Sequence, residues 1–353
     1  MDLEQLQRMP KVALHDHLDG GLRPGTVRDH LEDIGHECPS RDAEVLGEWF
    51  FDEANSGSLP AYLQTFDYTV AAMRNREHVV RVAREAVEDL AADGVVLAEL
   101  RWAPEQHVTR DFSLTDAVEA VRDGMAEGVS AAAAEGRTIV ARQILTSMRH
   151  ADPTPEIAEL AVAYRDDSVA GFDIAGAEDG FPSTRFAKVF EYLRRQNFPF
   201  TIHAGEASGP QSVFEAVQVC GARRIGHGVR LIEDIDVSGP TPKLGRLAQY
   251  VLDQQIMLEV CPTSNLQTGA AERIEDHPVG RLFDLGFNIS INCDNRLISG
   301  TSMSREFQVA AETFGWDEHD LQRITLDALQ ASFLHHDEKL RLLEDVILPA
   351  HGC

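Results

Sequence analysis

The chain has 353 residues, of which 43% are hydrophobic, so it is long enough to bury a sizeable core. Its net charge of −26 comes from 58 acidic and 32 basic residues, and such a surface repels nucleic-acid phosphates and anionic lipid. This balance favours a small, uncharged substrate. We expect no membrane span, because no apolar run reaches about eighteen residues, and no secretory signal.

The five cysteines are an odd number and include no Cys-x-x-Cys pair. This usage indicates reduced thiols in a cytoplasmic protein, and it argues against a disulfide framework and against a cysteine-based zinc site. The cysteines are Cys38, Cys220, Cys261, Cys293 and Cys353.

Eight strand-like runs alternate with helical patterns along the chain. The first run is Val12 to Leu18, and helices are expected to begin near Thr241 and at Pro278, before the last two runs. This alternation predicts an α/β fold, a single TIM-type (β/α)8 barrel over residues 1–353 with extra C-terminal helices. The other strands are predicted at 95–102, 138–145, 169–175, 198–203, 224–227, 256–260 and 287–292, and the C-terminal helices at 303–348.

A long insertion, at about residues 21–94, separates the first two strands. Within it, apolar residues recur at helical spacing, which predicts an amphipathic helix. This helix can pack on the barrel, form a lid over a substrate, or do both. The apolar positions are Leu59, Tyr62, Leu63 and Phe66.

Metal-ligand residue types occur at the ends of several strands. His15 and His17 are two residues apart on the first strand, so both imidazoles point to one face. His203 ends the fifth strand and Asp294 follows the eighth. Because the carboxyl ends of barrel strands meet at one edge, these four side chains form a candidate zinc site.

Two further residues at this edge suit hydrolytic chemistry. A metal held there would lower the pKa of a water molecule enough to give hydroxide at neutral pH. His227 lies between Gly226 and Gly228 and can act as a base or as an orienting group for that water. Glu206 follows His203 by three residues and can protonate a substrate atom, because burial raises a carboxyl pKa.

Six segments carry recognisable motifs: Pro10–Gly20, Leu97–Pro104, His203–Glu206, Gly226–Gly228, Leu258–Asn265 and the segment around Asp294. In combination they resemble the adenosine deaminases, which are zinc barrels of the amidohydrolase superfamily. The resemblance runs from about residue 10 to 340, and Ser58–Tyr68 is similar to the family's lid over the purine.

The resemblance implies a metal and a reaction. One zinc ion per chain would be held by four ligands, Glu206 would donate a proton to purine N1, and His227 would orient or deprotonate the water that adds to C6. No redox or nucleotide cofactor is needed. The implied ligands are His15, His17, His203 and Asp294.

The resemblance also implies how the substrate is bound. Asp19 matches the position that holds a ribose hydroxyl, Gly176 matches the backbone donor to purine N3, and His17 also contacts the substrate. Asn295 faces purine N7, where many family members have aspartate in Asp-Asp-Pro. Because N7 is an acceptor, an amide can donate to it and an ionised carboxylate cannot.

The implied activity is hydrolytic deamination of adenosine, and of 2′-deoxyadenosine, to inosine and ammonia in purine salvage. The expected partner is thus a purine nucleoside, with no nucleic acid and no membrane. One alternative is a related aminohydrolase that acts on free adenine or on a modified adenine nucleoside, although Asp19 favours a ribose. A second alternative, a non-catalytic binding protein on the same barrel, is disfavoured because every ligand is retained together with Glu206 and His227.

Overall fold

The structure is a computed structural model that describes residues 1–239 and 241–350. Its centre consists of parallel strands in two four-stranded sheets, ordered β1-β2-β3-β4 and β10-β9-β6-β5. These strands are β1 (Lys11–His17), β2 (Val95–Trp102), β3 (Val140–Met148), β4 (Val169–Ala175), β5 (Ile202–Ala204), β6 (Arg224–His227), β9 (Met257–Val260) and β10 (Ile289–Ile291).

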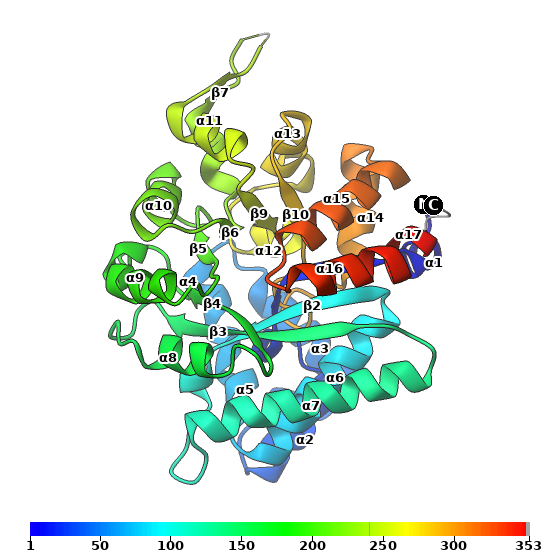
Figure 1. Cartoon of the computed structure of the whole chain (residues 1–353). Helices are drawn as coiled ribbons and strands as arrows, with labels where there is room; N and C mark the ends of the chain where they lie inside the picture. The colour runs from blue at the N-terminus through cyan, green and yellow to red at the C-terminus, as the bar shows by residue number, and fades with distance from the viewer. Residues whose placement is uncertain (240, 351–353) are drawn as a thin grey trace.

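Two isolated bridges join the edges of these sheets. Asp16 of β1 pairs with Asp294 after β10, and Phe172 of β4 pairs with Phe200 before β5. The strands therefore follow one another around a ring, and helices surround them (Figure 1). This arrangement confirms the predicted TIM-type α/β fold.

The helices lie mainly between successive strands, and the extra C-terminal helices are present as predicted. They are α1 (Leu3–Arg8), α2 (Pro24–Asp33), α3 (Ala43–Ala54), α4 (Leu59–Tyr62), α5 (Phe66–Ala71), α6 (Arg76–Ala92), α7 (Leu114–Ala134), α8 (Glu156–Ala163), α9 (Ala187–Arg195), α10 (Pro210–Phe214), α11 (Arg246–Asp253), α12 (Pro262–Gln267), α13 (Pro278–Asp284), α14 (Met303–Phe314), α15 (Glu318–Ala331), α16 (His336–Leu342) and α17 (Leu348–Ala350).

Close helix packing supports the first half of the barrel. α6 and α7 lie side by side outside β2 and β3 (Figure 1). Gly124 of α7 permits this approach, because a Cβ atom there would lie 2.3 Å from the carbonyl oxygen of Val80. Every residue of β1 and β2 is buried, as expected for parallel strands covered on both faces.

One predicted helix start was wrong. The helix expected near Thr241 begins at Arg246, because β7 (Ile235–Asp236) and β8 (Lys243–Leu244) form an antiparallel hairpin first. The carboxylate of Asp234 then accepts the backbone N–H groups of the first turn of α11, at 3.0 and 2.8 Å. The fifth strand is also shorter than predicted and begins at Ile202.

The insertion after β1 carries α2 to α6. The amphipathic helix predicted there is broken into α4, a 3-10 turn and α5, which begins at Phe66. Leu59 and Tyr62 are buried, whereas Leu63 and Phe66 are half-buried and line a cavity. The apolar stripe therefore contacts both the barrel and the cavity.

None of the helices in the described ranges is long and apolar enough to cross a membrane. The described cysteines, Cys38, Cys220, Cys261 and Cys293, are free thiols, and Cys353 lies outside the described residues.

Candidate active site

The four predicted metal ligands meet at the carboxyl ends of the strands. Nε2 of His17 lies 3.2 Å from Nε2 of His203 and 3.3 Å from Oδ1 of Asp294. Nε2 of His15 lies 3.4 Å from the same Asp294 oxygen and has no hydrogen-bond partner although it is buried. Three imidazoles and a carboxylate that converge in this way fit the ligand set of a zinc ion. A nitrogen of His227 also lies within 4.8 Å of the ligand atoms of His15, His203 and Asp294.

The protonation states of these groups suit a metal. Burial lowers the pKa of His17 to about 3, despite the opposing charge of Asp294, and it also lowers the pKa of His203. Burial alone would raise the pKa of Asp294, but the neighbouring imidazole of His15 holds it well below its usual range. Neutral imidazoles and an ionised carboxylate are the forms that bind a cation.

Two site residues have a left-handed backbone without being glycine. Asp294 has φ of 62° and His227 has φ of 65°. Such a conformation is unfavourable and persists where surrounding contacts enforce it. The backbone of Asp294 is held by β1, since its carbonyl accepts the N–H of His17 at 2.7 Å and its N–H donates to His15 at 3.0 Å. A Cβ atom at Gly226 would lie 3.1 Å from the ring of His15, so only glycine fits beside this ligand without displacement.

A buried carboxylate that sequence reasoning did not assign lies beneath the ligands. Glu259 of β9 accepts from Nδ1 of His15 at 3.1 Å, from Arg101 at 2.6 Å, from Arg224 at 2.7 Å and from Thr201 at 2.9 Å. Burial would raise the pKa of Glu259, but the two guanidinium groups hold it well below its usual range. Glu259 lies within the segment Leu258–Asn265, one of the motifs on which the family resemblance rests, and this was the sequence signal that could have identified it.

Two more groups hydrogen-bond or pair with the candidate ligands. Asp173 lies 3.0 Å from Nδ1 of His203 and pairs with Arg101 at 2.8 Å. The hydroxyl of Ser264 donates to the second oxygen of Asp294 at 2.6 Å. Partners of this kind fix the orientation of a metal ligand and raise its affinity for the ion.

Glu206 is 5% exposed and lies beside the ligand cluster, with Oε2 3.6 Å from Nε2 of His227. Burial, followed by the charges of Asp294 and Glu178, raises the pKa of Glu206 well above its usual range. The carboxyl therefore stays protonated at a pH where an exposed glutamate is ionised, as sequence reasoning expected.

The loop that carries Glu206 is held by another carboxylate. Glu178 accepts the backbone N–H groups of residues 205, 206, 207 and 208, at 2.7, 3.1, 2.7 and 2.9 Å. From the other side, the N–H of Arg230 donates to the carbonyl of Gly205 at 2.9 Å. Sequence reasoning missed Glu178, because it follows β4 whereas the loop that it holds follows β5.

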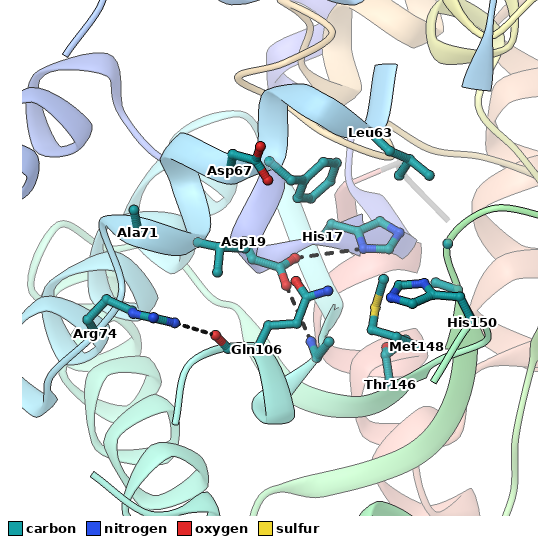
Figure 2. A pocket seen from close by; sticks show the side chains of 15 residues that line it. His17, Asp19, Leu63, Asp67, Ala71, Arg74, Gln106, Thr146, Met148 and His150 are labelled. Atoms are coloured by element: carbon teal, nitrogen blue, oxygen red, sulfur yellow. Dashed lines mark hydrogen bonds and ion pairs between the residues drawn. The ribbon is translucent and has the colours of Figure 1, made fainter. Parts of the chain in front are cut away.

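A cavity of about 500 Å³ opens beside the candidate ligands and is lined by three of the predicted substrate-binding residues, His17, Asp19 and Gly176. Figure 2 shows His17 and Asp19 at this cavity. One oxygen of Asp19 accepts the N–H of Ala103 at 3.3 Å, and the other is buried without a hydrogen-bond partner. Burial would raise the pKa of Asp19, but its hydrogen bond with His107 lowers it. This second oxygen lies 3.8 Å from Nδ1 of His17 (Figure 2) and makes no hydrogen bond, so it is available as an acceptor at the cavity.

Asn295, the fourth predicted substrate contact, lies outside the residues that line this cavity. Its Nδ2 donates to the hydroxyl of Tyr62 at 2.8 Å, and this hydroxyl is 2.9 Å from that of Ser299. Its Oδ1 is buried without a partner. The insertion thus contacts the residue that follows Asp294 through Tyr62, which the sequence placed on an apolar stripe and in the segment similar to the family's lid.

Comparisons with known proteins agree with this geometry. The sequence profile of the adenosine deaminase family matches residues 10–349. "Adenosine deaminase 1" of Streptomyces coelicolor is 53% identical over 351 residues, covering 99% of this chain and 89% of that protein. An adenosine deaminase of Mycobacteroides abscessus is 51% identical and covers 100% of this chain and 98% of that protein.

Solved structures share the fold at lower identity. An adenine deaminase from Arthrobacter aurescens has a TM-score of 0.82 at 24% identity, covering 98% of this chain and 100% of that one. An amidohydrolase from Burkholderia ambifaria with bound zinc has a TM-score of 0.83 at 24% identity, covering 99% and 92%. With the family profile matched over almost its whole length and relatives about half identical to it, the chain belongs to the adenosine deaminase family.

Proposed function

We propose that the protein is a zinc-dependent hydrolase that converts adenosine, and 2′-deoxyadenosine, to inosine and ammonia. The observation that carries this proposal is the placement of a protonated, buried Glu206 beside four convergent metal-ligand side chains. The relatives that are about 50% identical over the whole chain are adenosine deaminases, which supports the same activity here.

The proposed ligands are His15, His17, His203 and Asp294, which fit one zinc ion per chain. A zinc ion held by them would act as a Lewis acid and make a hydroxide nucleophile available at neutral pH. The imidazole and carboxylate donors favour zinc over magnesium or calcium, which prefer oxygen ligands.

The protein's own groups supply the proton transfer. C6 of adenine is a poor electrophile until N1 is protonated, and Glu206 is the acid that we assign to this step. We assign His227, whose Nε2 lies 3.6 Å from Oε2 of Glu206, to orient or deprotonate the water that adds to C6. Addition gives a tetrahedral carbon, from which ammonia leaves.

The cavity contacts support a nucleoside substrate. We assign the unpartnered oxygen of Asp19 to a ribose hydroxyl, the backbone N–H of Gly176 to purine N3, and His17 to a further contact. Asn295 lies outside the residues that line the cavity, and we assign its amide to N7 on the family resemblance alone. A negative charge at Asp19 also disfavours a 5′-phosphate near it, because like charges in a buried site repel strongly.

We further propose that residues 21–94 belong to the same single domain of 1–353 and cover the substrate. Leu63 and Phe66 line the cavity from this insertion, which suits an apolar purine face. The free thiols at the four described cysteines support a reducing, cytoplasmic location.

The test is a substrate panel on zinc-loaded protein, followed by loss of absorbance at the adenine band and by ammonia release. We expect turnover of adenosine and 2′-deoxyadenosine, with much less for free adenine, N6-methyladenosine and AMP. A zinc-loaded protein inert toward adenosine but active on adenine or on a modified nucleoside would overturn the proposed substrate. Inactivity toward every aminopurine, with zinc bound, would overturn the enzymatic function.

A further inference from the structure

Three buried side chains form a hydrogen-bonded series that ends at His227. The backbone N–H of Val279 donates to Nδ1 of His277 at 3.1 Å, and Nε2 of His277 lies 3.3 Å from Oδ1 of Asn265. Nδ2 of Asn265 then lies 3.1 Å from Nδ1 of His227. All three side chains are at most 3% exposed, so water does not compete for these contacts.

The direction of the first hydrogen bond is fixed by the backbone. A peptide N–H can only donate, so Nδ1 of His277 must carry a lone pair. The proton of a neutral imidazole then resides on Nε2, which donates to the carbonyl oxygen of Asn265. Burial lowers the pKa of His277 to about 3, which is consistent with a neutral ring.

The same assignment of donors and acceptors extends through the amide of Asn265 to His227. Because the oxygen of Asn265 faces His277, its NH2 group faces His227 and donates to Nδ1. Nδ1 of His227 is therefore an acceptor, and the proton of this imidazole is on Nε2. Nε2 is the nitrogen that faces Glu206, at 3.6 Å.

We propose that Asn265 and His277 are positioning residues that fix His227 as the Nε2–H tautomer, so that it donates a hydrogen bond to the attacking water oxygen. This inference rests on the proposed function for its chemical meaning. It decides between the two roles considered for His227, because a nitrogen that already carries a proton cannot take another from water.

The tautomer also decides which histidines can hold the metal. His227 lies as close to the ligand cluster as a ligand would, but a protonated Nε2 has no lone pair for a cation. His17 takes that place in the ligand set instead. Asp294, the ionised carboxylate that faces His227, is then the group available to receive the proton of the water, because Glu206 is protonated until it transfers its proton to the purine.

The direct test is nitrogen NMR of the zinc-loaded, full-length protein labelled with 15N-histidine. Protonated and unprotonated ring nitrogens resonate in separate ranges, and His227→Asn identifies the signals of His227 by their loss. His30 provides an internal reference for the opposite tautomer, because its Nδ1 lies 2.9 Å from the carbonyl of Ala72 and must donate. We expect His227 to show a proton on Nε2, and a proton on Nδ1 would overturn the proposal.

The variant Asn265→Asp tests the series by reversing it. A carboxylate accepts from both histidines, so Nδ1 of His227 becomes the donor and Nε2 loses its proton. We expect the NMR signature of His227 to switch and kcat to fall by about 10²- to 10³-fold, as for loss of one donor to a developing oxyanion, with KM little changed. An unchanged tautomer, or a loss confined to KM, would contradict the proposal.

Asn288→Asp is the matched control, because it makes the same substitution at a partly exposed amide that donates to the carbonyl of Gln255 at 3.0 Å, away from the site. We expect it to change neither the His227 signals nor kcat. If Asn265→Asp does not fold, the measurement on the unmodified protein still decides the tautomer. Failure of the protein to deaminate adenosine would overturn the proposed function and leave the tautomer result standing, whereas turnover with a proton on Nδ1 would overturn only this inference.

Discussion

Replacing Glu259 by glutamine tests whether the buried charges beneath the ligands support both folding and metal binding. All four partners of Glu259 donate to it, with Arg101 and His15 on one oxygen and Arg224 and Thr201 on the other. His15 donates from Nδ1 in the tautomer that leaves Nε2 free for a metal. Glutamine is nearly isosteric, but its NH2 group faces two donors in either orientation.

The cost can be estimated from these contacts. Glu259, Arg101 and Arg224 are fully or almost fully buried, so the variant leaves guanidinium charge without its partner in a region of low dielectric. Breaking one member of a buried ion-paired network costs about 3–5 kcal/mol of unfolding free energy. Loss of the acceptor at His15 should weaken zinc binding by about 10- to 100-fold, the range found for groups that orient a metal ligand.

The variant Glu99→Gln separates the effect on folding stability from the effect on zinc binding. Glu99 accepts from the same Arg224, at 2.6 Å, but contacts none of the proposed ligands. We expect urea denaturation to show reduced stability for both variants, whereas competition with a chromogenic chelator should show weakened zinc binding for Glu259→Gln alone. Equal zinc affinity in Glu259→Gln and the unmodified protein would refute this reasoning.

Other substitutions test individual groups. Glu206→Gln should bind adenosine but lose kcat by about 10²- to 10⁴-fold, measured by steady-state kinetics; normal turnover would remove Glu206 as the acid. Glu178→Gln should lower kcat in the unmodified protein and have little effect when Glu206→Gln is already present, and equal losses in both backgrounds would mean that it acts elsewhere. Asn295→Asp should keep substantial activity, because many family members have aspartate there; its abolition would show that the N7 argument is incomplete. Glu306→Gln tests pH dependence: burial raises the pKa of Glu306 to about 7, so ionisation of the unfolded chain destabilises the protein as pH rises from about 4.5 to 7, by up to about 3 kcal/mol. The variant should therefore match the unmodified protein near pH 4.5 and exceed its stability at pH 8, and a difference that does not depend on pH would contradict this assignment.

The convergence of the candidate ligand side chains could be predicted from the sequence, because strand ends have a simple geometry. Parallel strands in a barrel end at one rim, so residues such as His15, His203 and Asp294 could be brought together from chain order alone. The same reasoning predicted the buried state of Glu206. The helix expected near Thr241 was wrong because its start depends on Asp234, whose capping contact lies across a hairpin that the local pattern does not reveal.

The sequence did not reveal side chains whose hydrogen-bond partners lie in another segment of the chain. Glu178 holds the loop after β5, Tyr62 contacts Asn295 from the insertion, and His277 reaches His227 through Asn265. Each is an ordinary polar residue in its own segment, and its partner lies at least twelve residues away. Only three-dimensional packing distinguishes such a residue from a solvated one.

The charges of the buried side chains beneath the candidate ligands indicate the kind of ion that the site would bind. Asp294, Asp173, Glu259, Glu99 and Asp19 are buried carboxylates linked directly or through imidazoles, and two guanidinium groups, those of Arg101 and Arg224, lie among them. The network therefore carries excess negative charge, and charge left unbalanced in a protein interior is strongly unfavourable. One divalent cation at the converging nitrogens of His15, His17 and His203 would offset part of this excess, and a ligand set with three imidazoles favours zinc over magnesium or calcium. The metal is thus proposed from two independent features, the geometry of the ligand atoms above and the charge of the network below them.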